Sequence, residues 1–348
     1  MRVFPFARLI DRIRGMGEHM INNGEILDRY LGPVYNLGDL DKKLEGCFST
    51  LNDQSEVNKF IHEQFTKNSD FYVKMYTNYD FFEGLIKNSL TKIKINKESP
   101  INILDLGSGS GNTIIPLLKL FPNSPIIASD LSLDLLYKLK QNIDNLYQES
   151  NSILLQLNAE KLNFLDNSFD LITGGAILHH LFHPEKTIEG CSNILKNNGS
   201  ALFYEPFQEG NMILCYIYET IINDDACKIN EHTKNFLKNM VWDFKTRSGS
   251  NKEEDIFSKI DDKWLFTKSY FYDLCDRFEF TKCILYPLYD TAHLFERQTL
   301  INLTFVDRNN TKDLLPAFVW NKIKSFDEYF SEEFKKELFI EGCIILNK

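Results

Sequence analysis

Three glycines at alternate positions, Gly107, Gly109 and Gly111, constrain the fold of this chain more than any other feature. They directly follow an apolar run over residues 101–106 and precede an amphipathic segment over residues 113–121. This order predicts a strand, a tight turn and a helix, because glycine lets the backbone bend sharply and approach a ligand closely. The helix would direct free N–H groups and the positive end of its dipole toward that ligand. The spacing G-x-G-x-G is not the dinucleotide fingerprint G-x-G-x-x-G, so NAD is not the first interpretation.

Strand-like and helix-like segments alternate beyond this turn, which predicts parallel strands with helices on both faces of the sheet. Ligands of such sheets lie at the carboxyl ends of the strands. Asp130 ends the second apolar run, 19 residues after Gly111, where an acid can accept hydrogen bonds from two ribose hydroxyls. The expected strands are residues 101–106, 125–130, 152–157, 169–174, 200–205, 279–288 and 338–346; the expected helices are residues 112–121, 132–147, 184–196 and 265–278.

Together these landmarks resemble the class I S-adenosylmethionine-dependent methyltransferases over about residues 95–206. The resemblance implies an α/β fold: a Rossmann-like, doubly wound, seven-stranded sheet whose last strand is antiparallel. The matching text is Leu104-Asp105-Leu106-Gly107-Ser108-Gly109-Ser110-Gly111, Ala128-Ser129-Asp130, Asn158-Ala159-Glu160, residues 166–170 and residues 194–199.

The resemblance also implies S-adenosylmethionine as the cofactor and gives its contacts. The glycines would let the backbone pass its amino-acid half, and Asp105 would hold its ammonium directly or through water. Asp130 would bind the ribose, Leu131 would pack on the adenine, and Asn158 with Ala159 would meet the adenine amino group. Many relatives carry Asp where Asn158 stands, but an amide oxygen can still accept that hydrogen bond. The expected cofactor-binding residues are Asp105, Gly107, Ser108, Gly109, Gly111, Asp130, Leu131, Asn158, Ala159 and Tyr76.

A candidate catalytic pair follows the fourth and fifth expected strands: His179 lies just beyond the fourth, and Glu205 ends the fifth. Neighbouring strands lie ~4.8 Å apart, so side chains at their carboxyl ends can meet. Histidine can take a proton from an acceptor, and a carboxylate can fix its tautomer. Ile177-Leu178-His179 followed by Glu205 is similar to the methyltransferase domains of polyketide synthases and their free-standing relatives, in which such a pair is the catalytic dyad. Leu-His-His-Leu also occurs in quinone- and sterol-type methyltransferases, and a pocket-shaping His179 or a structural Glu205 are the alternatives.

A metal site is not expected. His179, His180 and His183 lie close together in the sequence, and His179 and His183 have the i, i+4 spacing that suits zinc on a helix. Pro184, however, predicts a helix start and puts both histidines in the preceding loop. The sequence offers no third ligand at a convincing spacing.

The chain is expected to have two parts. Apolar stripes with helical spacing over residues 1–95 predict an N-terminal helical lid or subdomain, with Tyr76 or Tyr79 nearest the cleft. Residues 96–348 predict the methyltransferase domain, interrupted by acceptor-lid insertions at about residues 207–264 and 289–334. Aromatic residues there would suit an apolar acceptor pocket but are also typical of ordinary core: Phe207, Tyr216, Tyr218, Trp242, Trp264, Phe266 and Tyr270.

Composition excludes several classes of partner. Lys and Arg number 39 against 49 Asp and Glu, and a net charge of −10 argues against nucleic acid. Seven cysteines without a C-x-x-C motif predict reduced thiols and a cytoplasmic protein. No apolar run approaches the ~18–20 residues of a membrane span, and charged residues interrupt the first ten, which predicts neither integral membrane association nor a signal peptide.

The sequence thus predicts methyl transfer from S-adenosylmethionine to a small or carrier-tethered organic acceptor. Oxygen is the favoured nucleophile and an activated carbon the second, in natural-product or polyketide biosynthesis with an acyl carrier protein as a candidate partner. His179 would be the general base and Glu205 would orient it. The alternatives are a quinone or lipid methyltransferase at a membrane surface, with residues 4–14 as its amphipathic segment, and a non-catalytic cofactor-binding scaffold.

Overall fold

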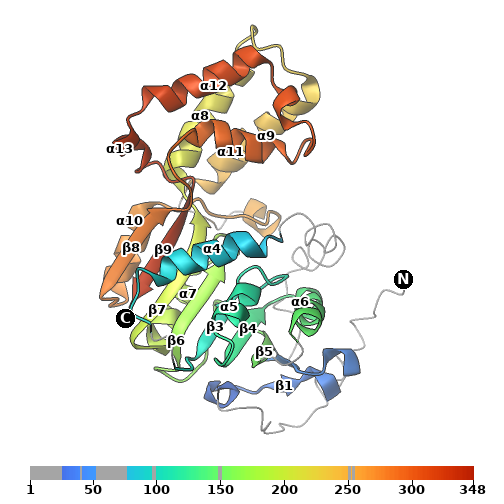
Figure 1. The fold of residues 1–348 in the computed structure, drawn as a ribbon, viewed down its shortest axis with the longest axis vertical. Helices are drawn as coiled ribbons and strands as arrows, with labels where there is room; N and C mark the ends of the chain where they lie inside the picture. Colours follow the sequence, from blue (N-terminus) through green and yellow to red (C-terminus); the bar gives the residue numbers. More distant parts are fainter. Residues whose placement is uncertain are drawn as a thin grey trace.

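The computed structural model describes residues 26–39, 41–51, 77–95, 99–147, 151–249, 252 and 255–348. A nine-stranded sheet, in the order β1-β2-β5-β4-β3-β6-β7-β9-β8, runs through the described chain (Figure 1). Its strands are β1 (Tyr35–Asn36), β2 (Cys47–Ser49), β3 (Ile103–Leu106), β4 (Ile126–Asp130), β5 (Ser152–Gln156), β6 (Phe169–Gly175), β7 (Leu195–Pro206), β8 (Lys282–Pro287) and β9 (Glu341–Asn347).

The seven strands from β3 to β9 confirm the predicted Rossmann-like α/β fold. Strands β5, β4, β3, β6 and β7 are parallel neighbours, and β9 is antiparallel to both β7 and β8. The chain first builds the sheet from β3 toward β5 and then returns to the other side of β3, which makes β3 and β6 the point where the strand order reverses. The carboxyl ends of β3, β4, β6 and β7 therefore share one edge of the sheet, where ligands of such folds bind.

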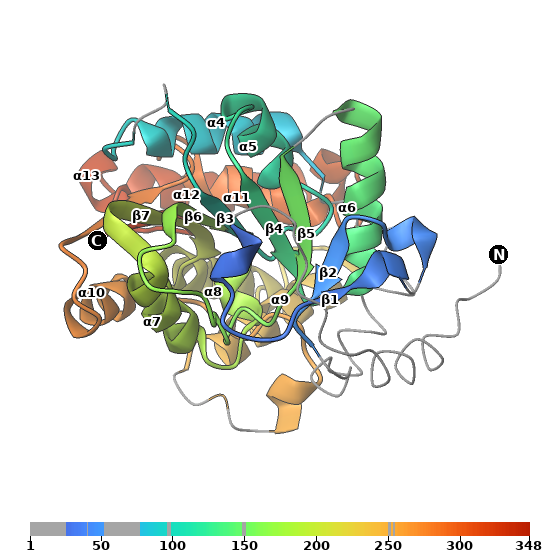
Figure 2. The ribbon, with the colours of Figure 1, turned by 90° about the horizontal axis from the view of Figure 1, so that it is seen from below.

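Helices cover both faces of the sheet (Figure 2). α4, α5 and α6 pack on one face around side chains such as Ile103, and α7 and α10 pack on the other around side chains such as Leu104. Successive strand residues point to opposite faces, so the side chains of the single apolar run in β3 pack into two separate cores. The helices of these layers are α4 (Tyr79–Leu90), α5 (Ile114–Leu120), α6 (Leu133–Leu146), α7 (Pro184–Ile194) and α10 (Lys268–Arg277).

The described part of residues 1–95 contains the helix α4 and also two strands that the predicted helical lid or subdomain did not include. β2 pairs in parallel with β5, and β1 pairs with β2, so this segment extends the sheet to nine strands instead of seven. A hydrogen bond of 2.8 Å from Ser49 Oγ to Gln156 Oε1 fastens β2 to β5. Helical periodicity could not reveal strands of two and three residues, because they are too short to show an alternating pattern. Residues 1–25 and 52–76 lie outside the described residues, so a lid over the site stays a prediction.

The two insertions come together as one helical lobe beside the sheet (Figure 1). Leu214 and Leu237 of the first insertion share a buried apolar core with Phe295 and Ile323 of the second. The Tyr218 hydroxyl also lies within hydrogen-bond distance of the second insertion. The lobe contains α8 (Gln208–Ile222), α9 (Glu231–Arg247), α11 (Leu294–Leu303), α12 (Ala317–Tyr329) and α13 (Glu332–Lys335).

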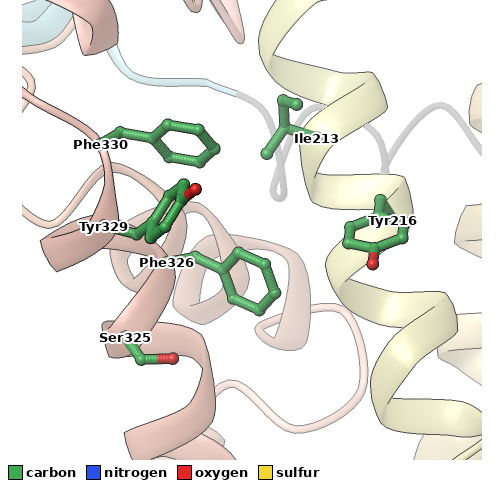
Figure 3. A pocket seen from close by; sticks show the side chains of 6 residues that line it. All are labelled: Ile213, Tyr216, Ser325, Phe326, Tyr329 and Phe330. Carbon is green, nitrogen blue, oxygen red and sulfur yellow. The ribbon is translucent and has the colours of Figure 1, made fainter.

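The lobe holds a largely apolar pocket of about 330 Å³ between α8 and α12 (Figure 3). None of the predicted catalytic or cofactor-binding residues lines this pocket. Several aromatic side chains that would have suited an acceptor pocket are instead ordinary core, since Phe207, Tyr218 and Phe266 are fully buried. The pocket is lined by Ile213, Tyr216, Ser325, Phe326, Tyr329 and Phe330.

Two further sequence predictions concern cysteines and membranes. All seven cysteines are free thiols. Within the described ranges, every helix is too short or too polar to cross a lipid bilayer.

Candidate active site

The loop after β3 contains three glycines in backbone conformations that other residues avoid. Because glycine has no side chain, the backbone at these three positions is not covered by a side chain of its own. Gly107, Gly109 and Gly111 have φ values of +62°, +52° and +114°. A Cβ atom on Gly107 would lie 2.7 Å from Cδ1 of Ile177, so this glycine also lets the segment after β6 pack on the loop. Among the described residues, a Cβ on Gly109 would meet only a backbone oxygen at 3.9 Å, so none of their side chains crowds this part of the loop. Such a loop can take a ligand against its backbone N–H groups.

Asp105 organises this loop from inside the protein. Its side chain is fully buried and accepts hydrogen bonds from the hydroxyls of Ser108 (2.6 Å), Thr113 (2.7 Å) and Thr173 (2.5 Å). Burial raises the pKa of Asp105 to about 6, although these three hydrogen bonds lower it. Asp105 thereby links β3 to the loop, to the start of α5 and to β6. A contact with the cofactor ammonium stays a prediction for this residue.

Asp130 lies at the carboxyl end of β4 and faces the same loop. Its Oδ2 accepts a hydrogen bond of 2.9 Å from the Gly109 N–H, and its Oδ1 accepts one of 2.8 Å from the Ser132 N–H. Burial raises the pKa of Asp130, whereas these two backbone donors and the charge of His180 lower it. Because its side chain is only partly buried, a hydroxyl-bearing ligand beside the loop could approach its remaining lone pairs.

The other expected cofactor contacts lie on the next two strand ends. Leu131 follows Asp130 and is partly exposed, as the predicted adenine contact requires. Asn158 follows β5 and accepts a hydrogen bond of 2.9 Å from the Glu160 N–H, while the backbone oxygen of Ala159 accepts one of 3.0 Å from Thr187. Tyr76 lies outside the described residues. The roles of these residues stay predictions.

The predicted catalytic pair is formed at the tips of β6 and β7. His179 Nδ1 lies 2.6 Å from Glu205 Oε2, and the side chains are nearly buried, at 9% and 0% exposure. Glu205 Oε1 also accepts the N–H groups of Ile177 (3.0 Å) and Leu178 (2.7 Å). Glu205 therefore stabilises the start of the 3-10 turn Leu178–His180, in addition to orienting the His179 ring.

The other ring nitrogen of His179 faces a residue that the sequence did not suggest. Its Nε2 lies 3.4 Å from Oδ1 of Asp262, whose Oδ2 lies 3.1 Å from Nη1 of Arg247. Burial lowers the pKa of His179, but Asp262 and Glu205 outweigh burial and raise this pKa to about 10. Asp262 lies 57 residues beyond Glu205 in a segment without a motif, and only folding brings it to the histidine.

The end of the first insertion is fastened to the same turn. The backbone oxygen of His179 accepts the Lys263 N–H at 2.7 Å, and the Trp264 indole donates to the backbone oxygen of Leu181 at 2.8 Å. Part of the expected acceptor lid thus contacts the predicted catalytic residue directly. Whether it covers an acceptor stays a prediction.

The sequence predicted no metal site, after His179, His180 and His183 were considered as ligands. In the structure His183 is instead 3.2 Å from Glu185, at the start of α7. His179 joins His180 and Asp262, and one ligand atom from each lies within 4.8 Å of the others. Adjacent histidines on a 3-10 turn gave no recognisable ligand spacing in the sequence, so the triple was missed.

The central part of the chain is similar in sequence to known proteins. Residues 103–199, which run from β3 into β7, match the family model described as a methyltransferase domain. The chain is 25% identical over 150 residues to the ubiquinone/menaquinone biosynthesis C-methyltransferase UbiE of Ectopseudomonas mendocina. This match covers 41% of this chain and 59% of that protein. It is 30% identical over 121 residues to the malonyl-[acyl-carrier protein] O-methyltransferase of a Paenibacillus species, covering 34% of this chain and 44% of that protein.

A solved structure extends the likeness of the fold beyond this domain. Phosphoethanolamine N-methyltransferase 2 of Haemonchus contortus, in complex with phosphomonomethylethanolamine and S-adenosylhomocysteine, has a TM-score of 0.51. It is 12% identical and covers 84% of this chain and 59% of that one, which shows a common fold. The chain spans less than two thirds of the length of both curated relatives. Residues 103–199 are thus similar to methyltransferase domains, within a Rossmann-like α/β fold.

Proposed function

We propose that this protein transfers the methyl group of S-adenosylmethionine to a small organic acceptor. The observation that carries the proposal is the buried pair of His179 and Glu205, 2.6 Å apart, on the sheet edge that also carries the glycine loop. When bound, the cofactor supplies an activated methyl group on a sulfonium. The protein would contribute position and proton transfer, because displacement at a sulfonium requires the nucleophile, methyl and sulfur in line.

The cofactor would lie against the loop of Gly107, Gly109 and Gly111. The part of the loop at Gly109, which no described side chain crowds, and the partly exposed Asp130 fit a ligand with a charged amino-acid end and ribose hydroxyls. Asp105 would act by holding the loop through Ser108 and Thr113, since its own oxygens already accept three hydrogen bonds. Leu131, Asn158 and Ala159 would line the adenine side, as the resemblance implies.

His179 would take the proton of the acceptor through Nε2, because Nδ1 faces Glu205. Glu205 would hold the ring in this orientation and stabilise its charged form. In the present arrangement Nε2 faces Asp262, which raises the pKa of His179 and favours its protonated form, so this carboxylate has to leave before His179 can accept a proton from an acceptor. An oxygen acceptor is favoured and an activated carbon is second, with polyketide-like or carrier-tethered molecules as the chemical class.

The relatives support two classes of acceptor. The malonyl-[acyl-carrier protein] O-methyltransferase favours oxygen on a carrier-bound acid, and the UbiE proteins favour carbon on a quinone ring. A quinone or lipid acceptor at a membrane surface is therefore the second candidate function. Residues 4–14, the amphipathic segment proposed for that role, lie outside the described residues.

A product assay separates these functions. Purified full-length protein would be incubated with labelled S-adenosylmethionine and three acceptor classes: malonyl groups on an acyl carrier protein, free phenolic or enolic acids, and a prenylated quinol in vesicles. We expect S-adenosylhomocysteine and a methylated product with the first or second class, and mass spectrometry of the product distinguishes O- from C-methylation. Methylation of the quinol alone would favour the second candidate. Binding of the cofactor without methylation of any class would favour a cofactor-binding scaffold and count against the proposal.

A further inference from the structure

We propose that His179, His180 and Asp262 form a binding site for a divalent transition metal ion such as Zn²⁺. One ligand atom from each of the three residues lies within 4.8 Å of the others. Imidazole nitrogens and a carboxylate oxygen are the donors that Zn²⁺ takes in three-ligand sites, with a fourth position left for another molecule. Ion binding at these residues does not depend on methyl transfer.

The distances from the carboxylate oxygen to the two ring nitrogens fit binding to a common metal ion better than direct hydrogen bonds. Oδ1 of Asp262 lies 3.4 Å from His179 Nε2 and 3.4 Å from His180 Nδ1. A charged N–H···O hydrogen bond is normally ~2.7–2.9 Å long. Two ligands bound at ~2.0–2.1 Å in a tetrahedron lie about 3.3–3.4 Å apart, which is the spacing between Asp262 and each histidine.

The surroundings of the triple supply the orienting contacts that metal sites use. Histidine ligands usually donate their second ring N–H to a carboxylate, and His179 Nδ1 lies 2.6 Å from Glu205 Oε2. Asp262 is held from its far side, because its Oδ2 lies 3.1 Å from Nη1 of Arg247. With these contacts made, Nε2 of His179 and Oδ1 of Asp262 face each other across the proposed metal site.

An ion could reach this place from solvent. The side chain of Asp262 is 38% exposed and that of His180 is 22% exposed, whereas His179 is nearly buried. Asp261 approaches His180 Nδ1 at 3.1 Å but is not part of the triple.

Metal binding would also regulate the proposed reaction, and this part rests on the proposed function. A metal on Nε2 of His179 leaves that nitrogen no lone pair for a proton, so the base role and ligation exclude each other. Zn²⁺ should then suppress turnover in proportion to its occupancy. Full turnover by zinc-saturated protein would refute this regulatory part and leave the binding site intact.

The binding site is tested with the full-length protein, first freed of metal by chelation. We expect calorimetry to show one Zn²⁺ per chain, and Co²⁺ to give the intense visible absorption of a low-coordinate N/O site. His180→Ala and Asp262→Ala should weaken Zn²⁺ binding at least tenfold, whereas the control His183→Ala should stay within about threefold of the parent protein.

Thermal unfolding of each variant would show whether it is folded. Equal Zn²⁺ affinity in the parent protein and in folded His180→Ala and Asp262→Ala would overturn the proposal, and so would a parent protein that binds no Zn²⁺ at micromolar concentrations. Failure of the methylation assay together with one tightly bound Zn²⁺ would refute the proposed function alone.

Discussion

The Nδ1 atom of His179 lies 2.6 Å from Oε2 of Glu205, and the same carboxylate accepts the backbone N–H groups of the turn that carries the histidine. One buried side chain at the end of β7 thus fixes both the ring of His179 and the backbone on which it stands. Because β6 and β7 are parallel neighbours, the pair lies on the sheet edge that carries the glycine loop.

Replacement of His179 should separate binding from turnover. We expect His179→Ala to bind S-adenosylmethionine with nearly parental affinity, while turnover falls by roughly 10²–10⁴, the usual contribution of a general base. Calorimetry and a discontinuous product assay measure the two quantities. His183→Ala is the matched control, since His183 lies in the same segment, pairs with Glu185 and is half exposed. Parental turnover in His179→Ala would place the base elsewhere.

Removal of the carboxylate of Asp130 should weaken cofactor binding. A hydrogen bond to a charged group contributes ~1.5–3 kcal/mol, so we expect about a 10- to 150-fold loss of affinity for Asp130→Ala. The loss includes the contact that Asp130 makes to the Gly109 N–H, which orders the loop. Asp144→Ala makes the same charge change on the exposed side of α6 and should leave affinity unchanged. Equal affinities for both variants in calorimetry would rule out Asp130 as a cofactor contact.

A side chain at Gly107 should destabilise the loop. Gly107 has a φ of +62°, and its new Cβ would lie 2.7 Å from Cδ1 of Ile177. The left-handed conformation alone costs ~1–2 kcal/mol for other residues, so Gly107→Ala should lower the unfolding free energy by at least that amount. Gly84→Ala, in α4 with no other described part of the chain within 4 Å of its new Cβ, should instead be stabilising by about 0.5–1 kcal/mol. Urea unfolding measures both, and an equally stable Gly107→Ala protein would contradict the loop geometry.

The stability of the protein should depend on the protonation of Asp105. Burial raises the pKa of this carboxyl to about 6 in the folded protein, above its unfolded value near ~3.9. The native state then binds more protons between about pH 4 and 6, so the contribution of Asp105 to stability is largest below pH 4 and declines by roughly 3 kcal/mol as the pH rises through 6.

Asp105→Asn removes this titration and serves as the reference. Unfolding free energies of the two proteins would be measured in urea at several pH values from 4 to 7. We expect the stability of the parent protein relative to Asp105→Asn to fall as the pH rises. A relative stability that rises with pH would show that the hydroxyls of Ser108, Thr113 and Thr173 favour the carboxylate more than burial disfavours it.

The sequence determined the core of the fold and most of the candidate site because the relevant signals are local. A strand, a glycine turn and a helix are encoded within residues 101–121, and the acid of Asp130 and the pair of His179 and Glu205 follow at strand ends. Alternation of strands and helices then fixes the sheet edge at which these residues gather. The antiparallel last strand was likewise expected, and β9 confirms it.

Tertiary structure alone decided what depends on contacts between distant segments. β1 and β2 join the sheet through pairing with β5, although strands of two and three residues carry no periodicity of their own. The two insertions form one lobe because each leaves an apolar face that the other covers. Asp262 reaches His179, and Arg247 reaches Asp262, across separations in sequence that no local pattern encodes. The charged groups around His179 come from segments far apart in the sequence, so only the folded structure shows which of them lie beside it.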